Sequence, residues 1–198
     1  MLNRIMNSEY QALLLLMLSF IVIGILMLII PLLFKNKTSN PKKDLNLDLT
    51  NNDIKKIDNT LDKEKLMSDI FDIYKKVEVA KSKFNYDILK ELLTDNLYQE
   101  ELNKLKELKE NKQKLVATNI KLQEVRILSI QKENGIDNIN AYLHVSRYDY
   151  VINNKKEIIR GTDKTEYQIE YKITLEKSTD KYLKIKKKEC TGKWIKNK

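Results

Sequence analysis

Cysteine and histidine are nearly absent from this chain of 198 residues, which contains one of each, Cys190 and His144. A lone cysteine excludes an intramolecular disulfide, which is typical of a reducing compartment. A zinc site would have to take its other ligands from carboxylates, and a Ser-His-Asp triad would have to use His144. Because His144 falls in an alternating strand pattern, we interpret it as a structural residue. The sequence therefore predicts no metal, no cofactor and no catalytic residues.

Charge of one sign does not dominate the folded part of the chain, although the formal net charge is +9. Residues 1–43 contain five basic residues and one glutamate, whereas residues 44–198 contain 32 basic and 27 acidic residues. The two signs alternate through most of the second stretch, which is typical of a solvated mixed surface rather than of a nucleic-acid-binding one. We expect no nucleic-acid partner.

One long apolar run, residues 12–34, contains no charged residue. As a helix rising about 1.5 Å per residue it is roughly 34 Å long, enough to cross a hydrocarbon core of about 30 Å. A cleaved signal peptide is the alternative. Against it, the run is long, lacks a small-residue cleavage pattern and is closed by Lys35 and Lys37. The sequence predicts a retained single-pass transmembrane helix in the cell membrane.

Lysines on the C-terminal side of this run predict its orientation. Lys35, Lys37, Lys42 and Lys43 follow the run closely, whereas the N-terminal tail carries one arginine and one glutamate. The positive-inside bias keeps such lysine clusters in the cytoplasm, so we expect a cytoplasmic domain. The same four lysines are candidate contacts to anionic headgroups of membrane lipid.

Composition divides the rest of the chain into a linker and one domain of ordinary size. Residues 1–11 form an N-terminal tail. Residues 35–59 are polar and contain Pro41, which predicts a flexible linker. The folded domain is expected at residues 60–190, followed by a C-terminal tail at residues 191–198.

Apolar residues at three- and four-residue spacing predict helices in the first part of the domain. The first helix carries Leu66, Ile70, Tyr74, Val77, Ala80 and Phe84 on its apolar side. Asp87 is the expected N-cap of a short second helix, and Thr94 that of a third. In the third helix we expect Glu101 to face water.

After Asn111 the apolar period changes from 3.6 to 2, which predicts strands. The predicted strands lie at residues 120–131, 137–152, 167–175 and 183–185. Alternation in the first of them slips near Glu124 and at Leu128, as in a bulged strand. We predict an α+β fold, with helices packed on one face of a curved antiparallel sheet of about four strands.

Three stretches are distinctive in combination: DILKELLTDNLYQEELNKLKEL, IKLQEVRILSIQ and the polar turn with its strand, NNKKEIIRGTDKTEYQIEYKITLEK. In this order, and with a tyrosine-rich strand before the turn, they resemble the C-terminal domain of the Tim44-like family over about residues 61–190. The resemblance implies a cone-shaped α+β fold similar to the NTF2-like and cystatin-like folds. A membrane anchor ahead of such a domain resembles the bacterial members of the family.

The resemblance also implies an adaptor or tether that works at membranes in protein import or secretion. We therefore expect a membrane-tethered module that binds a protein partner or the membrane surface. The candidate lining of a groove between helix and sheet is aromatic: Tyr74, Phe84, Tyr142, Tyr148, Tyr150, Tyr167 and Tyr171. Ordinary core packing is the alternative for these residues.

Two other functions fit parts of the pattern. The VirB8-like components of secretion machines also place a short cytoplasmic tail and one anchor before an NTF2-like domain, but that domain lies outside the cytoplasm. Topology separates this alternative from the adaptor hypothesis. An NTF2-like enzyme would need an acid and a base in its pocket, and the sequence pairs His144 with no defined carboxylate.

Overall fold

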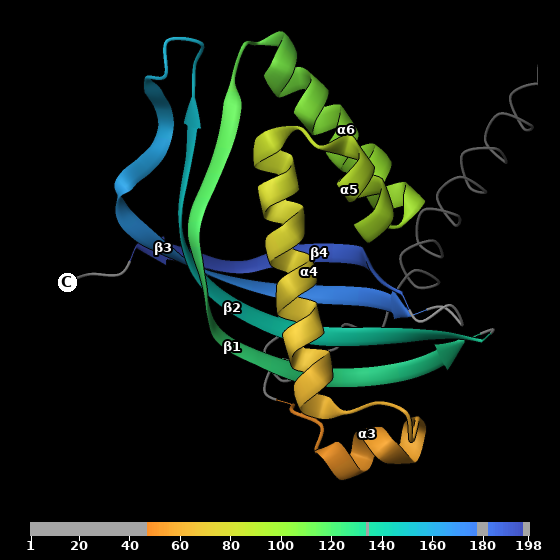
Figure 1. Cartoon of the computed structure of the whole chain (residues 1–198). Helices are drawn as coiled ribbons and strands as arrows, with labels where there is room; N and C mark the ends of the chain where they lie inside the picture. Colours follow the sequence, from red (N-terminus) through yellow and green to blue (C-terminus); the bar gives the residue numbers. More distant parts are fainter. Residues whose placement is uncertain (1–46, 134, 178–181, 196–198) are drawn as a thin grey trace, which may run out of the picture. The chain divides into compact units, whose positions relative to one another are not determined.

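The structure, a computed structural model, describes residues 47–133, 135–177 and 182–195 (Figure 1). The predicted transmembrane run at residues 12–34 lies outside the described residues. So do the four lysines that follow it, Lys35, Lys37, Lys42 and Lys43. Within the described ranges, no helix is both long and apolar enough to cross a membrane.

Helices come before strands along the described chain. The helices are α3 (Asn51–Ile57), α4 (Lys63–Lys83), α5 (Tyr86–Leu92) and α6 (Asp95–Glu110). The strands are β1 (Lys114–Glu133), β2 (Ile136–Ile152), β3 (Ile158–Lys177) and β4 (Leu183–Ile195). The strands form one antiparallel sheet in the order β1-β2-β3-β4. The predicted α+β class and four-stranded sheet are confirmed.

Helix α4 is the predicted amphipathic helix, and it crosses the sheet in Figure 1. Asp62 caps its first turn by accepting a hydrogen bond of 3.0 Å from the backbone N–H of Lys65. The helix ends at Phe84, which adopts a left-handed conformation with φ of 53° and packs half-buried against the core. Its predicted apolar residues are buried: Leu66, Ile70, Tyr74, Val77 and Ala80.

The caps of the two following helices differ from those predicted. Asn85, not Asp87, is the N-cap of α5, and its side-chain oxygen accepts a hydrogen bond of 3.2 Å from the N–H of Ile88. Phe84, in its left-handed conformation, ends α4 and reverses the direction of the chain. The next residue, Asn85, is therefore the N-cap of α5. Thr94 is the N-cap of α6, as predicted, but its side chain makes no capping hydrogen bond.

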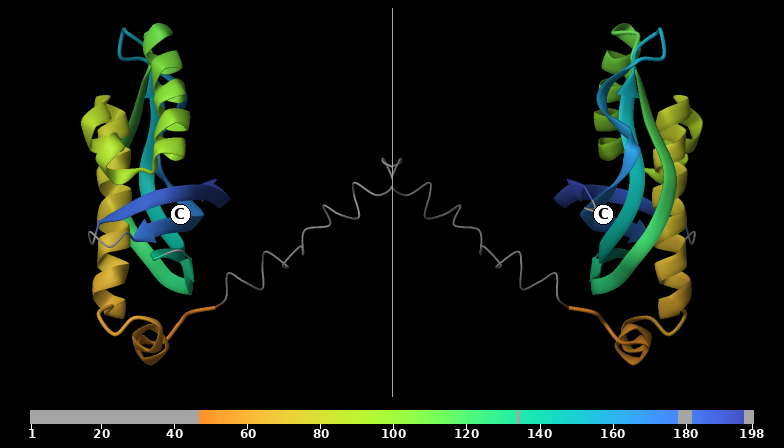
Figure 2. Two further views of the ribbon diagram at one scale, coloured as in Figure 1. Left: turned by 90° about the vertical axis from the view of Figure 1, so that its right-hand side faces the viewer. Right: turned by 90° about the vertical axis from the view of Figure 1, so that its left-hand side faces the viewer.

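Strand β1 is irregular where its predicted alternation fails. Its register with β2 shifts between Leu122 and Glu124 and again between Ile127 and Ser129, so both predicted slips are confirmed. A third shift lies nearer the start of the strand. Bulges increase the local twist of a strand, and β1 and β2 curve strongly along their length (Figure 2).

The inner face of the sheet carries the predicted apolar positions of the two central strands. Their buried residues are Ile139, Ala141, Leu143 and Val145 in β2, and Ile169, Tyr171, Ile173 and Leu175 in β3. Neighbours such as His144 and Lys172 point to the opposite, outer face, because side chains alternate along a strand. Residues from α3 to α6 pack with the inner face into one hydrophobic core.

The domain begins before residue 60. Helix α3 lies in the stretch whose composition predicted a flexible linker, and its Ile54 is fully buried in the core. Thr50 and Asp53 form a capping box at the start of α3. The backbone N–H of Leu49 donates to the carbonyl of Ile127 in β1 at 2.8 Å. The polar composition did not predict this helix, because a helix this short needs only one large buried apolar side chain to pack against the core.

The domain also ends after residue 190. Strand β4 continues to Ile195, and its Lys193 and Trp194 pair with Ile169 and Gln168 of β3. Residues 191–195 therefore belong to the sheet and not to a tail. Composition concealed this part of the strand because most of its side chains are exposed and polar.

Candidate functional site

A hollow lies between helix α6 and strands β1, β2 and β3. One part, of about 370 Å³, is lined by Leu105 and Leu108 of α6 and by Leu115 and Arg160 of the sheet. An adjoining part, of about 280 Å³, is lined by Leu115, Arg160, Tyr167 and neighbouring strand residues. Because both parts share Leu115 and Arg160, we treat them as one depression, the α6 hollow.

Gly161 brings β2 and β3 unusually close in the wall of the α6 hollow. The residue has φ of +81°, and a Cβ atom there would lie 2.3 Å from the backbone oxygen of Asp149. A contact that short is impossible, so the position requires glycine. Gly161 belongs to the polar stretch that was predicted to be a turn before the strand at residues 167–175, but it lies within β3 and pairs with Tyr150.

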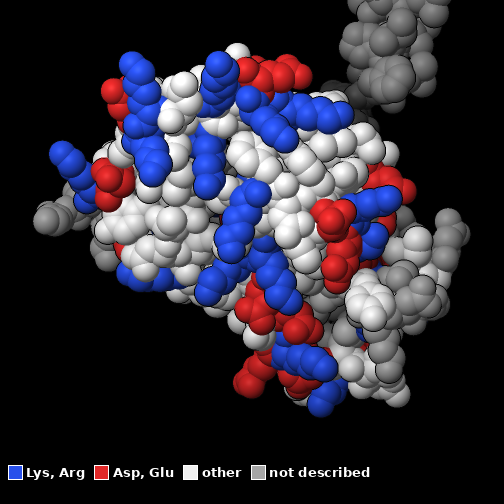
Figure 3. Space-filling model, turned by 45° about the horizontal axis from the view of Figure 1, so that its top comes forward, with Lys and Arg blue, Asp and Glu red and all other residues white. Residues whose placement is uncertain are grey.

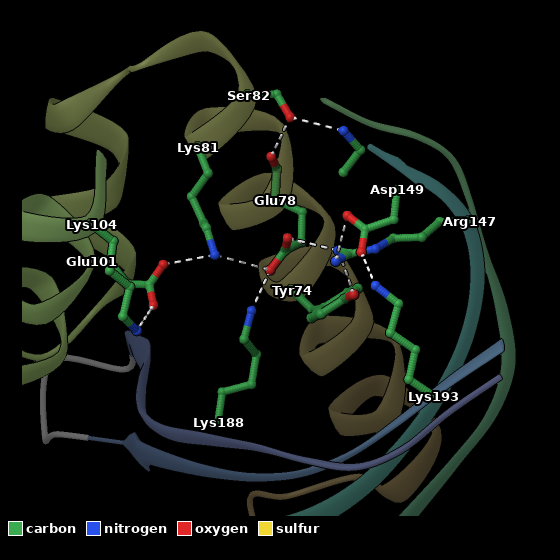
Figure 4. A network of polar contacts seen from close by, with 11 residues as sticks. Tyr74, Glu78, Lys81, Ser82, Glu101, Lys104, Arg147, Asp149, Lys188 and Lys193 are labelled. Carbon is green, nitrogen blue, oxygen red and sulfur yellow. Dashed lines mark hydrogen bonds and ion pairs between the residues drawn. The ribbon is translucent and has the colours of Figure 1, made fainter. Parts of the chain in front are cut away.

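A network of charged side chains, buried at its centre, borders the α6 hollow and joins α4, α6, β2 and β4 (Figure 4). At its centre, the fully buried carboxylate of Glu78 pairs with Arg147 at 2.7 Å and with Lys188. The ammonium group of Lys81 lies 2.7 Å from the carboxylate of Glu101 and 3.8 Å from that of Glu78. These pairs hold α6 and β4 against α4.

Both ends of the network reach the lining of the hollow. On α6, the ammonium group of Lys104 lies 2.8 Å from the Glu101 carboxylate. On the sheet, the Asp149 carboxylate pairs with Arg147 at 3.3 Å and with Lys193 at 2.5 Å. The network thus fixes charged side chains on both walls of the α6 hollow.

The two buried glutamates of the network are held in their ionised form. Burial by itself raises the pKa of Glu78, but Lys188, Lys81 and Arg147 outweigh burial and hold that pKa well below its usual value. Burial also raises the pKa of Glu101, but Lys81 and Lys104 outweigh burial and lower that pKa to about 2. Both carboxylates therefore keep their charge at any physiological pH.

We expect the domain to lose stability in acid through these two glutamates. A carboxylate whose pKa is depressed by folding stabilises the fold above its unfolded pKa, and this contribution is lost as the pH falls through the folded pKa. For Glu101 the loss runs from its ordinary value of 4.5 down to about 2, and Glu78 acts in the same direction. Urea unfolding of the full chain in detergent, followed by the fluorescence of its one tryptophan, Trp194, measures this loss.

The matched comparison is Glu101→Gln, which cannot titrate at this position. Between about pH 6 and pH 3 the urea midpoint should fall further for the unaltered protein than for this variant. An equal fall in both proteins would contradict a depressed pKa for Glu101.

The aromatic residues predicted to line a groove do not all lie together. Tyr74 and Tyr171 pack in the core with ring centroids 5.5 Å apart. Burial raises the pKa of both, that of Tyr171 to about 12. Tyr150 and Tyr167 border the α6 hollow, and the ammonium group of Lys193 lies 4.5 Å from the centre of the Tyr167 ring.

The other three aromatic residues lie away from the α6 hollow. Tyr142 is on the outer face of the sheet, where its hydroxyl donates to Glu170 at 2.7 Å and Arg126 stacks 4.3 Å from its ring centre. Tyr148 is partly exposed and pairs with Thr118 of β1, at the point where the register between β2 and β3 shifts. Phe84 packs against the core at the end of α4.

His144 and Cys190 do not line the α6 hollow. On the outer face, the Nε2 atom of His144 lies 3.0 Å from the side-chain oxygen of Gln168, and its ring centroid is 5.6 Å from that of Trp194. Cys190 is exposed and unbridged. In the described part of the chain, no group of three or more His, Cys, Asp or Glu side chains is arranged to hold a metal ion.

Glu101 is the clearest correction to the sequence analysis at this site. It was expected to face water, but its side chain is only 9% exposed. The residue lies one helical turn before the buried Leu105, so its side chain turns inward with the apolar side of α6. Lys81 and Lys104 compensate its charge there.

A family model identifies the family to which this domain belongs. The family model of the Tim44-like domain matches residues 48–194, a span that includes α3 and most of β4. The chain therefore belongs to the Tim44-like domain family, as its sequence predicted. A solved structure, the crystal structure of the intermembrane space region of the chloroplast protein ARC6, is similar with a TM-score of 0.47 and 14% identity, over 66% of this chain and 96% of that chain. A comparison with curated proteins gave no match.

Proposed function

We propose that this protein is a membrane-tethered adaptor whose Tim44-like domain binds a protein partner through the α6 hollow. The observation that carries the proposal is the α6 hollow itself, a solvent-accessible depression with charged walls fixed by a buried ion network. A fixed depression with defined polar groups favours recognition because little order has to be created on binding. Membership of the family supports protein translocation as the process.

Binding fits the chemistry of the α6 hollow better than catalysis does. A general acid or base works best with a pKa near the working pH. Glu78 and Glu101 have pKa values far below that range, because their cationic neighbours hold them ionised. The charges of these residues serve to fix the helices and strands around the hollow.

We further propose that residues 12–34 form the anchor and that the domain is cytoplasmic. A tether concentrates the domain near partners at the membrane, so that a weak contact there is sufficient. Lys35, Lys37, Lys42 and Lys43 would add about 1 kcal/mol each by contact with anionic headgroups close to the surface. The length of the apolar run and its flanking lysines support this arrangement.

Photocrosslinking in intact cells tests the proposal. A photoreactive residue in place of Gln113, which borders the α6 hollow, should crosslink to one protein partner. The same residue in place of Lys172, on the outer face, should not. Removal of residues 1–35 should sharply reduce the crosslink from position 113, because the domain is then no longer concentrated at the membrane.

Equal crosslinking from both positions would overturn the α6 hollow as the binding site. Full crosslinking without the anchor would overturn the role of the tether. A reporter active only in the cytoplasm, fused after Lys198, should give a signal. A signal from an extracytoplasmic reporter alone would favour the VirB8-like arrangement instead.

A further inference from the structure

We infer that the α6 hollow recognises an acidic peptide segment, and that Arg160 binds a carboxylate of that segment. The inference rests on the proposed function and specifies the chemistry of the partner. It is carried by one unpaired guanidinium group, by the charge balance of the surrounding network and by the shape of the hollow.

Arg160 occupies the junction of the two parts of the α6 hollow. The residue is exposed on β3, and none of the ion pairs that the described acidic residues make includes it. A guanidinium group offers N–H donors in a planar fork that matches the two oxygens of a carboxylate. This side chain is therefore available to a ligand, unlike Lys193, which pairs with Asp149.

The ion network beside Arg160 contains more positive than negative charge. Its basic members are Lys81, Lys104, Arg147, Lys188 and Lys193, and its acidic members are Glu78, Glu101 and Asp149 (Figure 4). With Arg160 and with Glu107, which also lines the hollow, six basic side chains stand against four acidic ones. The excess of two positive charges attracts an anionic group.

The surface at the upper end of the domain in Figure 1 also carries more positive than negative side chains. Figure 3 turns the upper end of Figure 1 toward the viewer, and Lys and Arg side chains there are more prominent than Asp and Glu side chains. Such a surface steers an acidic partner toward the α6 hollow before contact.

The composition of the walls favours a peptide over a phosphate-rich surface. Glu101, Glu107 and Asp149 lie among the basic residues and would repel a continuous row of phosphates. A bilayer surface is flat and does not fill a depression, whereas a few side chains of a peptide do. Leu108 and Leu115, which are partly exposed, give the α6 hollow apolar contacts for the aliphatic parts of such a segment.

The test uses the full chain in detergent micelles and a short fluorescent peptide of alternating glutamate and leucine. The unaltered protein should bind this peptide, and Arg160→Glu should weaken binding by about tenfold or more, because repulsion replaces a charge-assisted pair. Lys172→Glu makes the same change from a positive to a negative charge on the outer face and should bind as the unaltered protein does. A peptide with lysine in place of glutamate should not bind.

Equal weakening by Arg160→Glu and Lys172→Glu would overturn the inference, because attraction would then follow net charge alone. Binding of phosphatidylglycerol vesicles that depends on Arg160, without binding of the peptide, would also overturn it. If the crosslink from position 113 persists at full strength in cells carrying Arg160→Glu, the inference fails and the proposed function stands. Absence of that crosslink from the unaltered protein would overturn the proposed function itself.

Discussion

Glu78→Gln should lower the free energy of unfolding by about 3 to 5 kcal/mol. The Glu78 side chain is fully buried, and Arg147, Lys188 and Lys81 lie within ion-pair distance of its carboxylate. Glutamine preserves the shape of the side chain but removes its charge. The three cations are then left without their central counter-charge, and breaking a buried ion pair in this way is strongly destabilising. Urea unfolding of the full chain in detergent, followed by Trp194 fluorescence, measures the change.

Glu100→Gln is the matched control for this prediction. It makes the same chemical change at an exposed position of α6, and it should cost less than about 0.5 kcal/mol. The double variant Glu78→Met with Lys188→Met should be more stable than Glu78→Met alone, because one unpaired cation is removed with the carboxylate. Equal costs for Glu78→Gln and Glu100→Gln would mean that the network contributes nothing to stability.

The elements of this fold could be predicted because burial imposes a period on the sequence. Helix α4 places Leu66, Ile70 and Tyr74 on one side, and β3 buries every second residue around Ile173. The bulges of β1 were also visible in the sequence, as breaks in the alternation of apolar and polar residues. Helix α3 was not visible in this way, since seven residues with one buried isoleucine are too few to establish a period.

The ion network could not be predicted from the period of the apolar residues, because that period assigns every charged residue to the solvent-exposed side of its helix or strand. Glu78 follows Tyr74 by four residues on the apolar side of α4, and Arg147 follows Val145 by two on the inner face of β2. A charged residue in register with an apolar pattern was thus an available signal. Its partners were not available, because Glu78 and Lys188 are 110 residues apart in the chain and only folding brings them together.

The prediction of an aromatic groove shows a related limit. Strand alternation correctly separates Tyr171 from its neighbours on the outer face, but it does not show whether a helix covers the ring. Tyr171 lies beneath α4 against Tyr74 and is buried, whereas Tyr167, four residues earlier on the same strand, borders the α6 hollow. The difference depends on where α4 and α6 leave the sheet uncovered.

Ile173→Ala should destabilise the domain by about 2 to 5 kcal/mol, because it removes buried methyl groups and leaves a cavity. Ile173 is fully buried in the central strand β3, between Ala141 of β2 and Lys188 of β4. Lys172→Ala, one residue away on the outer face, should cost less than about 0.5 kcal/mol. Urea unfolding of the full chain in detergent measures both variants. Since a shift of one residue in register would exchange the two faces, similar costs at both positions would show that the inner face of β3 is assigned wrongly.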